Sequence, residues 1–330
     1  MVQVTVVVPI YNVSAYLERS LGSLKNQSYK DFEVLCVNDG STDDSATVIQ
    51  KFVDSDDRFK RLDKQNGGLS DARNFGLKQV ATPYVMFLDS DDYYELDMLE
   101  LAMNRMTLDR LDCVVFDYNQ FFDETKFKEH IHLPFESNKI YDPKTNKEIF
   151  AYVNNAAWNK LYRTEIFKQN NIEYPFGYRH QDLGTTFRYL TFCERVGFID
   201  KPLYNYLADR PNNITQQVDA KIDHILDMVQ LNISFFKERN IFEMYYEELK
   251  YLSVINLLYS FRKLPQFTNR RFVFDFIERT FGLLKSNFPD YAKSMYPIWD
   301  EPNANIYLNK NKLKAYYLYT SLRRRLCKKS

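Results

Sequence analysis

Glycine is scarce in this sequence, since its 330 residues include only 9 Gly, together with 4 Cys and 2 Trp. No apolar run approaches the roughly 18 residues that a membrane-spanning helix needs. The first residues predict a strand rather than a signal peptide, because a basic region and a small-residue cleavage site are missing. The cysteines form no Cys-x-x-Cys pair, which argues against a zinc knuckle or disulfide framework and favours a reducing, cytoplasmic setting. They are Cys36, Cys113, Cys193 and Cys327.

An excess of charge of one sign is also absent, because 44 Lys and Arg balance 44 Asp and Glu. This balance argues against nucleic acid as a partner. The last 21 residues nevertheless hold eight bases and no acid, interleaved with Leu and Tyr. Such a tail is typical of an amphipathic segment on an anionic membrane surface, and a solvated C-terminal helix is the alternative. The eight bases are Lys310, Lys312, Lys314, Arg323, Arg324, Arg325, Lys328 and Lys329.

What the sequence does contain is a regular alternation of strand-like and helix-like segments over its first hundred residues. This alternation predicts βαβ units and an α/β fold with a mostly parallel sheet flanked by helices. Mixed sequence follows to about residue 206, and long amphipathic stretches after about residue 213 predict helices. We therefore expect an α/β domain over residues 1–212, divided at about residue 115, and a helical C-terminal region over 213–330.

Polar clusters follow three predicted strands or the turns after them. Asp39 ends the second strand, residues 66–74 (NGGLSDARN) open a helix, and Asp89 and Asp91 follow the strand at 83–88. Ligands of open α/β sheets bind outside the carboxyl ends of the strands. We therefore expect these side chains to converge on one site.

The pair Asp89 and Asp91 has the chemistry of a divalent-cation site. Mg²⁺ and Mn²⁺ prefer oxygen ligands, usually take one or two protein carboxylates, and complete their shell with water and substrate phosphates. The alternative is a polar turn before a helix that starts near Glu95, because short motifs often match by chance.

Asp39 suits a carboxylate that accepts hydrogen bonds from a base or ribose, although a satisfied turn aspartate is an equal alternative. Residues 66–74 combine flexible backbone, a helix N-terminus and Arg73, features suited to an anionic or nucleotide ligand. The sequence contains neither the glycine-rich dinucleotide fingerprint nor a P-loop. Dinucleotide redox chemistry and P-loop chemistry therefore lose their main support.

Four segments in order resemble the motifs of family 2 nucleotide-sugar glycosyltransferases: residues 6–12 (VVVPIYN), 37–43 (VNDGSTD), 66–74 and 87–92 (FLDSDD). The resemblance is strong to about residue 115, moderate to about 206 and weak beyond. It implies a GT-A fold with a nucleotide-sugar-binding half over 1–115 and an acceptor-binding half over 116–212. It also implies inverting transfer from a nucleoside diphosphate sugar with bound Mn²⁺ or Mg²⁺.

The resemblance also implies roles for individual residues. Asp91, with Asp89 and with His180 as a further candidate, would hold the metal. A lone His beside a turn is more often structural, so both interpretations of His180 stay open. The residues implied in nucleotide-sugar binding are Pro9, Tyr11, Asn12, Asp39, Asn66, Gly67, Asp71, Arg73, Asp89 and Ser90.

The family often has a Glu-Asp pair whose carboxylate takes the proton of the acceptor hydroxyl, and Gln181-Asp182 stands at the matching place. The resemblance therefore implies Asp182 as the general base. Gln181 stands where the family often has Glu, so the residues that hold Asp182 in position stay open. Trp158 is a candidate platform for the acceptor sugar, and a buried core Trp is the alternative.

Together these features predict an inverting glycosyltransferase that moves a sugar from a UDP-sugar to a hydroxyl of a growing glycan. A lipid-linked surface polysaccharide is the expected acceptor, and homo-oligomerisation stays open. One rival is a sugar-phosphate nucleotidyltransferase, whose glycine-rich loop after the first strand is missing here. The other is a non-catalytic glycan- or lipid-binding module on the same scaffold.

Overall fold

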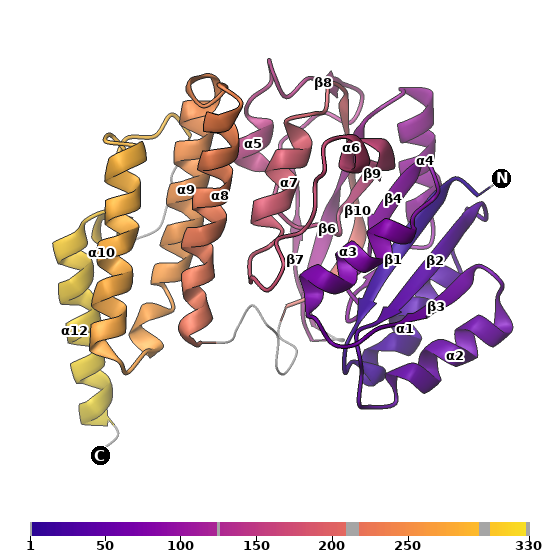
Figure 1. Cartoon of the computed structure of the whole chain (residues 1–330), viewed down its shortest axis with the longest axis horizontal. Coiled ribbons are helices and arrows are strands. Elements are labelled where there is room, and N and C mark those ends of the chain that lie inside the picture. Colours follow the sequence, from indigo (N-terminus) through magenta and orange to yellow (C-terminus); the bar gives the residue numbers. More distant parts are fainter. Residues whose placement is uncertain (1, 124–125, 209–217, 297–303, 328–330) are drawn as a thin grey trace. The chain divides into compact units, whose positions relative to one another are not determined.

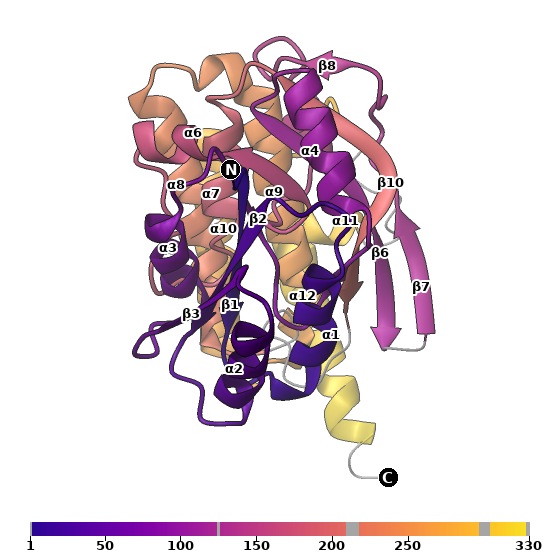
Figure 2. The same cartoon turned by 90° about the vertical axis from the view of Figure 1, so that its right-hand side faces the viewer.

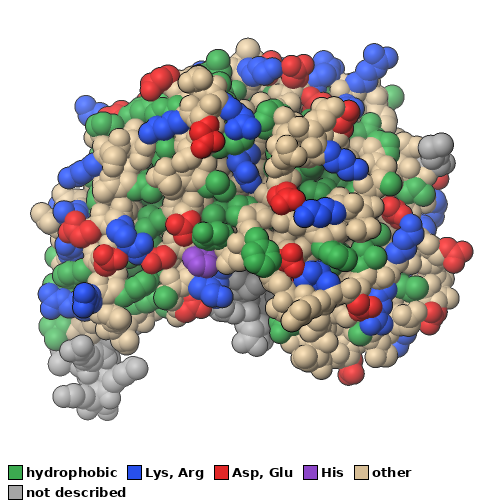
Figure 3. Space-filling view, in the orientation of Figure 1, with side chains coloured by type: hydrophobic (Ala, Val, Ile, Leu, Met, Phe, Trp, Pro, Cys, Tyr) green, Lys and Arg blue, Asp and Glu red, His purple; other side chains and the backbone are tan. Residues whose placement is uncertain are grey.

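The computed structural model describes residues 2–123, 126–208, 218–296 and 304–327, without the side chains of residues 123, 304 and 324–327. Two compact units make up the chain, Met1–Asn213 and Ile214–Ser330. The domain boundary predicted at residue 212 falls in 209–217, outside the described residues. On the face drawn in Figure 3, basic and acidic side chains are interspersed.

The first unit is a mixed sheet with helices packed on it (Figure 1). Its strands run in the order β3-β2-β1-β4-β9-β6-β10-β5, with β7 beside β6 and β8 beside β10. The elements are β1 (Val4–Ile10), α1 (Ser14–Lys25), β2 (Phe32–Asn38), α2 (Ser45–Ser55), β3 (Phe59–Asp63), α3 (Leu69–Gln79), β4 (Tyr84–Phe87), β5 (Tyr93–Tyr94), α4 (Met98–Leu108), β6 (Cys113–Asp123), β7 (Lys126–Ile131), β8 (Ile140–Tyr141), α5 (Ile149–Tyr152), β9 (Lys160–Arg163), α6 (Thr164–Gln169), α7 (Leu183–Leu190) and β10 (Val196–Leu207).

The predicted α/β fold is confirmed, and the sheet changes character along its width. Strands β3, β2, β1 and β4 are parallel, as the βαβ pattern predicts. Strand β9 then lies antiparallel to both β4 and β6, and β6 and β7 form an antiparallel hairpin whose long strands lie side by side in Figure 2. Beyond β4 the sheet is therefore mixed rather than mostly parallel.

Alternating residues of β1 build two apolar layers. Val6 and Val8 pack in one core with residues of α1, α2 and α4. Val7 points to the opposite face, where α3 approaches so closely that a Cβ atom at Gly76 would lie 2.4 Å from Val7 Cγ1. This close approach packs α3 directly against β1 and β2.

The second unit consists of helices, as its amphipathic sequence predicts. Aromatic rings such as Phe236, Phe261 and Phe281 fill its interior. Within the described residues, no helix is both long and apolar enough to cross a lipid bilayer. The elements are three 3₁₀ turns (Ala220–Asp223, Glu243–Tyr245 and Leu264–Gln266), α8 (His224–Glu238), α9 (Tyr246–Phe261), α10 (Arg270–Asn287), α11 (Ala304–Tyr307) and α12 (Lys310–Cys327).

Residues 310–327 of the basic tail form α12, and part of this helix contacts its own unit. Lys310 and Lys314 both form ion pairs with Glu278 of α10, at 2.9 and 2.5 Å. Leu313 and Tyr317 are buried, whereas three apolar side chains of the same helix are exposed, namely Leu318, Tyr319 and Leu322. Four of the eight bases, Arg324, Arg325, Lys328 and Lys329, have side chains outside the described residues.

The contact between α3 and β1 predicts that Gly76→Ala destabilises the protein. The added methyl would overlap Val7, and overpacking of this kind costs about 1–3 kcal/mol, which outweighs the roughly 0.5–1 kcal/mol that Ala gains over Gly in a helix. Urea unfolding followed by circular dichroism measures the change.

Gly22→Ala is the matched control, because Gly22 lies in α1 and a Cβ atom there would meet nothing within 4 Å. This variant should be as stable as the parent chain or slightly more stable. Equal stability of the two variants would show that α3 does not depend on its close approach to β1.

Candidate active site

The predicted site residues lie at one edge of the sheet. Pairing of Ile10 with Asn38 and of Val7 with Phe87 brings the carboxyl ends of β1, β2 and β4 to the same level. Asp39 follows β2 directly, and Asp89 lies two residues after β4. The expected convergence of the strand-end motifs is therefore present in the parallel half of the sheet.

Asp39 organises the turn that leads into α3. Its buried carboxylate accepts hydrogen bonds from the backbone amides of Gly67 (3.0 Å) and Gly68 (2.8 Å) and pairs with Lys64 at 2.5 Å. Lys64 also contacts Asp71 at 2.5 Å. The carboxylate thus joins the motif at residues 37–43 to the motif at residues 66–74 through backbone and side-chain contacts.

The backbone requires a glycine in each of two neighbouring turns, the turn after β2 and the turn before α3. Gly40 and Gly68 have φ angles of 71° and 86°, in the left-handed region that favours glycine. At Gly40 a Cβ atom would lie 2.9 Å from the backbone nitrogen of Asn66, so the two turns touch directly. Asn66 in turn donates from its side chain to the backbone oxygen of Asp39 at 3.0 Å.

The loop after β1 is fixed to the loop after β2. Asn12 has a φ of 51°, and its side-chain oxygen accepts a hydrogen bond of 2.7 Å from the backbone nitrogen of Thr42. Pro9 is buried at the end of β1, whereas the ring of Tyr11 is 49% exposed at the edge of the sheet. Tyr11 and Asn12 are thus the accessible members of the three residues predicted here, whereas Pro9 is not.

Arg73 is the centre of the site. Its side chain is completely buried on α3, and its Nη2 atom donates to Asp89 at 2.5 Å. Its Nη1 atom donates to Asp182 and, at 3.1 Å, to the side-chain oxygen of Gln181. The guanidinium lies 5.3 Å from the centre of the Tyr174 ring. One side chain therefore connects the third motif, the end of β4 and the start of α7.

The electrostatics of this cluster favour proton uptake by Asp182. Burial raises the pKa of Asp182, and although Arg73 opposes this shift, Asp89 adds to it, so the pKa is above its ordinary value. The Asp182 side chain keeps 20% of its surface exposed. A carboxylate that is reachable and more basic than usual is suited to accept a proton.

In the segment 89–92, the carboxylate of Asp89 faces the site and that of Asp92 faces the interior. Asp89 pairs with Arg73, and the backbone oxygen of Asp91 accepts from Arg19 at 3.1 Å. Asp92 is buried and accepts hydrogen bonds from the Tyr204 hydroxyl (2.6 Å) and from the backbone nitrogen of Leu207 (2.7 Å). Asp92 thus ties the turn after β4 to β10, a role that no pattern in the sequence indicates.

Ser90 and His180 are the remaining residues predicted near the metal. Ser90 is buried between the two aspartates, and His180 has a φ of 59° directly before Gln181. Among the described residues, the ligand atoms of Asp89, Asp91 and His180 do not gather within 4.8 Å of one another. His180 therefore does not join the two aspartates in one compact ligand set.

Trp158 lies in the core of the first unit. Only 7% of its surface is exposed, and its ring stacks on Tyr204 with a centroid distance of 4.2 Å and meets Tyr118 edge-on at 4.7 Å. Of the two interpretations left open by the sequence, this geometry favours the buried core residue over the sugar platform.

Lys160 is a buried cation that the sequence analysis missed. Its Nζ atom donates to the backbone oxygens of Asn154 (2.9 Å) and Ala156 (2.7 Å) and to the side chain of Asn159 (2.7 Å). Burial lowers its pKa to about 7, although Cys113 and Asp182 oppose the shift. A lysine at the start of a strand carries no sequence signal for burial, so only the structure reveals that it fixes the segment before β9.

Comparison with known proteins assigns the family. Residues 5–170, half of the chain, match the model of glycosyl transferase family 2. The chain belongs to this family. Putative glycosyltransferase EpsH of Bacillus subtilis is 30% identical over 77% of this chain and 74% of its own length. Glycosyltransferase GlyA of Streptococcus pneumoniae is 33% identical over 62% of this chain, but the match spans only 30% of GlyA.

Solved structures share the fold at low sequence identity. S. aureus TarS 1-349 in complex with UDP-GlcNAc matches with a TM-score of 0.75 and 19% identity, over 98% of this chain and 92% of that chain. The mannosyltransferase PcManGT from Pyrobaculum calidifontis, in complex with GDP-Man and Mn²⁺, matches with a TM-score of 0.52 and 14% identity, over 99% and 88% of the two chains. The protein is a glycosyltransferase with the GT-A type of fold.

Arg73→Met is predicted to lower the stability of the chain by about 3 kcal/mol. Removing one partner of a buried ion pair costs about 3–5 kcal/mol, and the 24% and 20% exposure of the two aspartate side chains places the effect at the lower end. Unfolding in urea measures the loss. Lys78→Met is the control, because the pair of Lys78 and Glu173 is exposed and worth at most about 1 kcal/mol. Equal losses in the two variants would contradict the central role of Arg73.

Proposed function

We propose that this glycosyltransferase moves a sugar from a UDP-sugar to an acceptor hydroxyl with inversion at the anomeric carbon. The observation that carries the proposal is the arrangement in which Arg73 joins Asp89 at the end of β4 to Asp182 at the start of α7. A donor held at the strand ends would then face the base. The complex of TarS with UDP-GlcNAc supports UDP as the nucleotide.

We propose that Asp91 and Asp89 hold Mn²⁺ or Mg²⁺ together with the donor diphosphate. Two carboxylates two residues apart at a strand end are the donor set that such hard cations prefer. When bound, the ion would neutralise the charge that develops on the departing diphosphate. The Mn²⁺ in the complex of PcManGT supports a divalent ion at this type of fold.

Asp182 is the proposed general base. Its carboxylate would take the proton of the acceptor hydroxyl while that oxygen attacks the anomeric carbon and the nucleoside diphosphate leaves from the opposite side. Arg73 orients the carboxylate through a direct hydrogen bond, and the raised pKa increases its affinity for the proton. Single displacement of this kind inverts the anomeric centre.

The other residues proposed to contact the donor lie around the carboxyl ends of β1, β2 and β4. Tyr11 is exposed beside the loop after β2, where a nucleoside ring would reach it, and we propose that Pro9, Asn12 and Asp39 complete that pocket. The residues proposed to position the diphosphate and ribose are Asn66, Gly67, Asp71, Arg73, Asp89 and Ser90. The acceptor is proposed to be a glycan that is lipid-linked during synthesis.

The first test is metal-dependent hydrolysis of donors in the absence of acceptor. We expect release of UDP from at least one of a panel of UDP-sugars in the presence of Mn²⁺, loss of this release in EDTA, and recovery when Mn²⁺ is added back in excess. GDP-mannose is the control for the nucleotide. A full rate in EDTA would contradict the metal role, and pyrophosphate release from a nucleoside triphosphate and a sugar phosphate would favour a nucleotidyltransferase.

Asp182→Asn should abolish most turnover while leaving the donor bound. General-base assistance contributes about 10²–10⁴-fold, so kcat should fall by that factor. Calorimetry should give a donor dissociation constant close to that of the parent chain. Because the base must be ionised, kcat of the parent should fall as the pH drops through the raised pKa of Asp182, at a pH above the ordinary aspartate value of about 4.

Asp54→Asn is the control for this substitution, because Asp54 is exposed on α2 and its carboxylate accepts a hydrogen bond of 2.8 Å from the side chain of Gln50, on the same helix. Its kcat should match that of the parent chain. Retained turnover in Asp182→Asn would reject Asp182 as the base, whatever the donor proves to be.

A further inference from the structure

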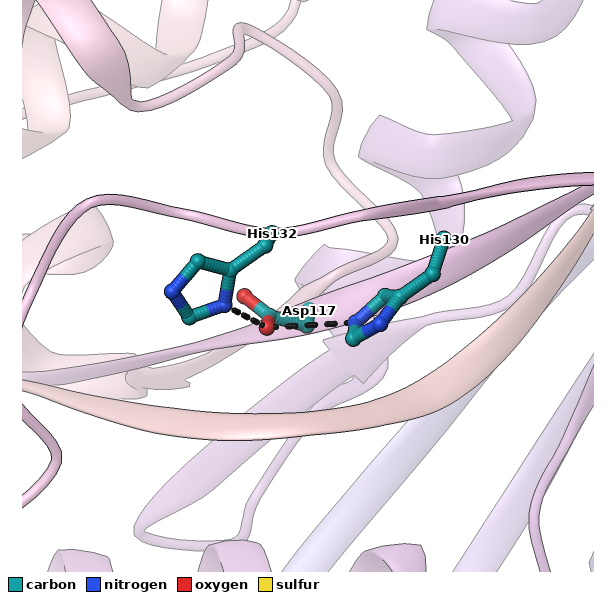
Figure 4. A group of neighbouring side chains, drawn as sticks. All are labelled: Asp117, His130 and His132. Atoms are coloured by element: carbon teal, nitrogen blue, oxygen red, sulfur yellow. Dashed lines mark hydrogen bonds and ion pairs between the residues drawn. The ribbon is translucent and has the colours of Figure 1, made fainter.

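A second cluster of potential metal ligands lies on the β6–β7 hairpin. Asp117 is on β6, His130 is on β7 and His132 follows β7 by one residue (Figure 4). In the register of the hairpin, His130 lies opposite Asn119, so His132 continues to the level of Asp117. Because side chains alternate along a strand, residues 130 and 132 share one face. None of these three residues belongs to a motif recognised in the sequence.

The three side chains are already directed toward one another. Oδ2 of Asp117 lies 2.7 Å from Nδ1 of His132 and 3.3 Å from Nε2 of His130. One ligand atom from each residue falls within 4.8 Å of the others, and this is the one such group of three found within the described part of the chain. No backbone movement is therefore needed to bring the three donors to a common ion.

Asp117 is held in place from its other side. The carboxylate is only 1% exposed, and its Oδ1 atom accepts a hydrogen bond of 2.9 Å from the backbone nitrogen of Leu133. Metal-ligating carboxylates are commonly fixed in this way by a partner that leaves the second oxygen for the ion. His130 and His132 are 39% and 59% exposed, so an ion can reach the cluster from solvent.

The donor set selects a class of ion. Two imidazole nitrogens and one carboxylate suit Zn²⁺ and similar transition metals, whereas Mg²⁺ and Mn²⁺ prefer oxygen ligands. Ligand atoms about 2.0–2.1 Å from a tetrahedral ion lie about 3.3 Å apart, close to the distances found around Oδ2. We propose that Asp117, His130 and His132 bind one Zn²⁺ ion, with water in the fourth position, at a site distinct from the Asp89–Asp91 pair.

This inference does not depend on the proposed sugar transfer. A bound ion would join β6 to the segment that leaves β7, and it would compensate the charge of the buried Asp117 carboxylate. The competing explanation is that the two imidazoles contact Asp117 only through polar side-chain contacts and no metal binds. If the metal proposal holds, both histidines coordinate added Zn²⁺. If the contacts with Asp117 are all that the cluster provides, Zn²⁺ does not bind there.

The test uses the untagged full chain, freed of metal by chelation and dialysed into buffer with millimolar Mg²⁺. The Mg²⁺ competes with Zn²⁺ for sites made of oxygen ligands, and the histidine variants below separate this site from the Asp89–Asp91 pair whether or not that proposal holds. Calorimetry with ZnCl₂ should show one ion per chain, and Co²⁺ in place of Zn²⁺ should give the visible absorption of a tetrahedral site. His130→Gln and His132→Gln should each weaken Zn²⁺ binding by more than about tenfold.

These histidine variants are the informative ones, because both side chains are partly exposed and their replacement should leave the fold intact. Asp117→Asn is less informative, since the buried carboxylate also fixes Leu133. His224→Gln, a substitution on α8 in the second unit, is the matched control and should bind Zn²⁺ as the parent does. Absence of Zn²⁺ uptake by the parent, or unchanged affinity in either His130→Gln or His132→Gln, would overturn the proposal.

Discussion

The two ion pairs that buried Arg73 forms with Asp89 and Asp182 are the constraint on which the rest of the site depends. Arg73 comes from a helix, Asp89 from the end of β4 and Asp182 from the start of α7, so one guanidinium fixes three elements. The cluster contains one positive and two negative charges. Burial raises the pKa of Asp182, Arg73 opposes this shift and Asp89 adds to it. The excess negative charge of the cluster makes this end of the sheet favourable for a further cation.

Asp39 has a structural task in addition to the contact with the nucleoside that is proposed for it. The sequence predicts a carboxylate that contacts the nucleoside base, but the oxygens of Asp39 are already engaged by Gly67, Gly68 and Lys64. These contacts hold the turn before α3 and hence the start of the helix that carries Arg73. A nucleotide would therefore meet a pocket whose shape Asp39 maintains, in addition to any hydrogen bond that the carboxylate itself accepts.

The sequence predicted those features that are local in the chain and missed those that are not. Alternating segments and strand-end motifs give the parallel half of the sheet and the convergence of Asp39, Arg73 and Asp89. The contact of Arg73 with Asp182 spans 109 positions, and no local pattern encodes it. The same holds for burial of Lys160, for the tie between Asp92 and β10, and for the antiparallel insertion of β9, because each depends on tertiary packing.

Gln181 shows how the structure accounts for a departure from the family pattern. A Glu at this place would add a third negative charge beside Asp89 and Asp182, with Arg73 as the direct cationic partner. The amide oxygen of Gln181 accepts from Arg73 at 3.1 Å, as a carboxylate would, without adding charge. Its side chain also hydrogen-bonds Asp182 in a way that lowers the pKa of that residue, which an ionised Glu has no proton to do. The amide therefore limits the upward shift that burial and Asp89 produce, and it keeps Asp182 supported through both Arg73 and its own neighbour.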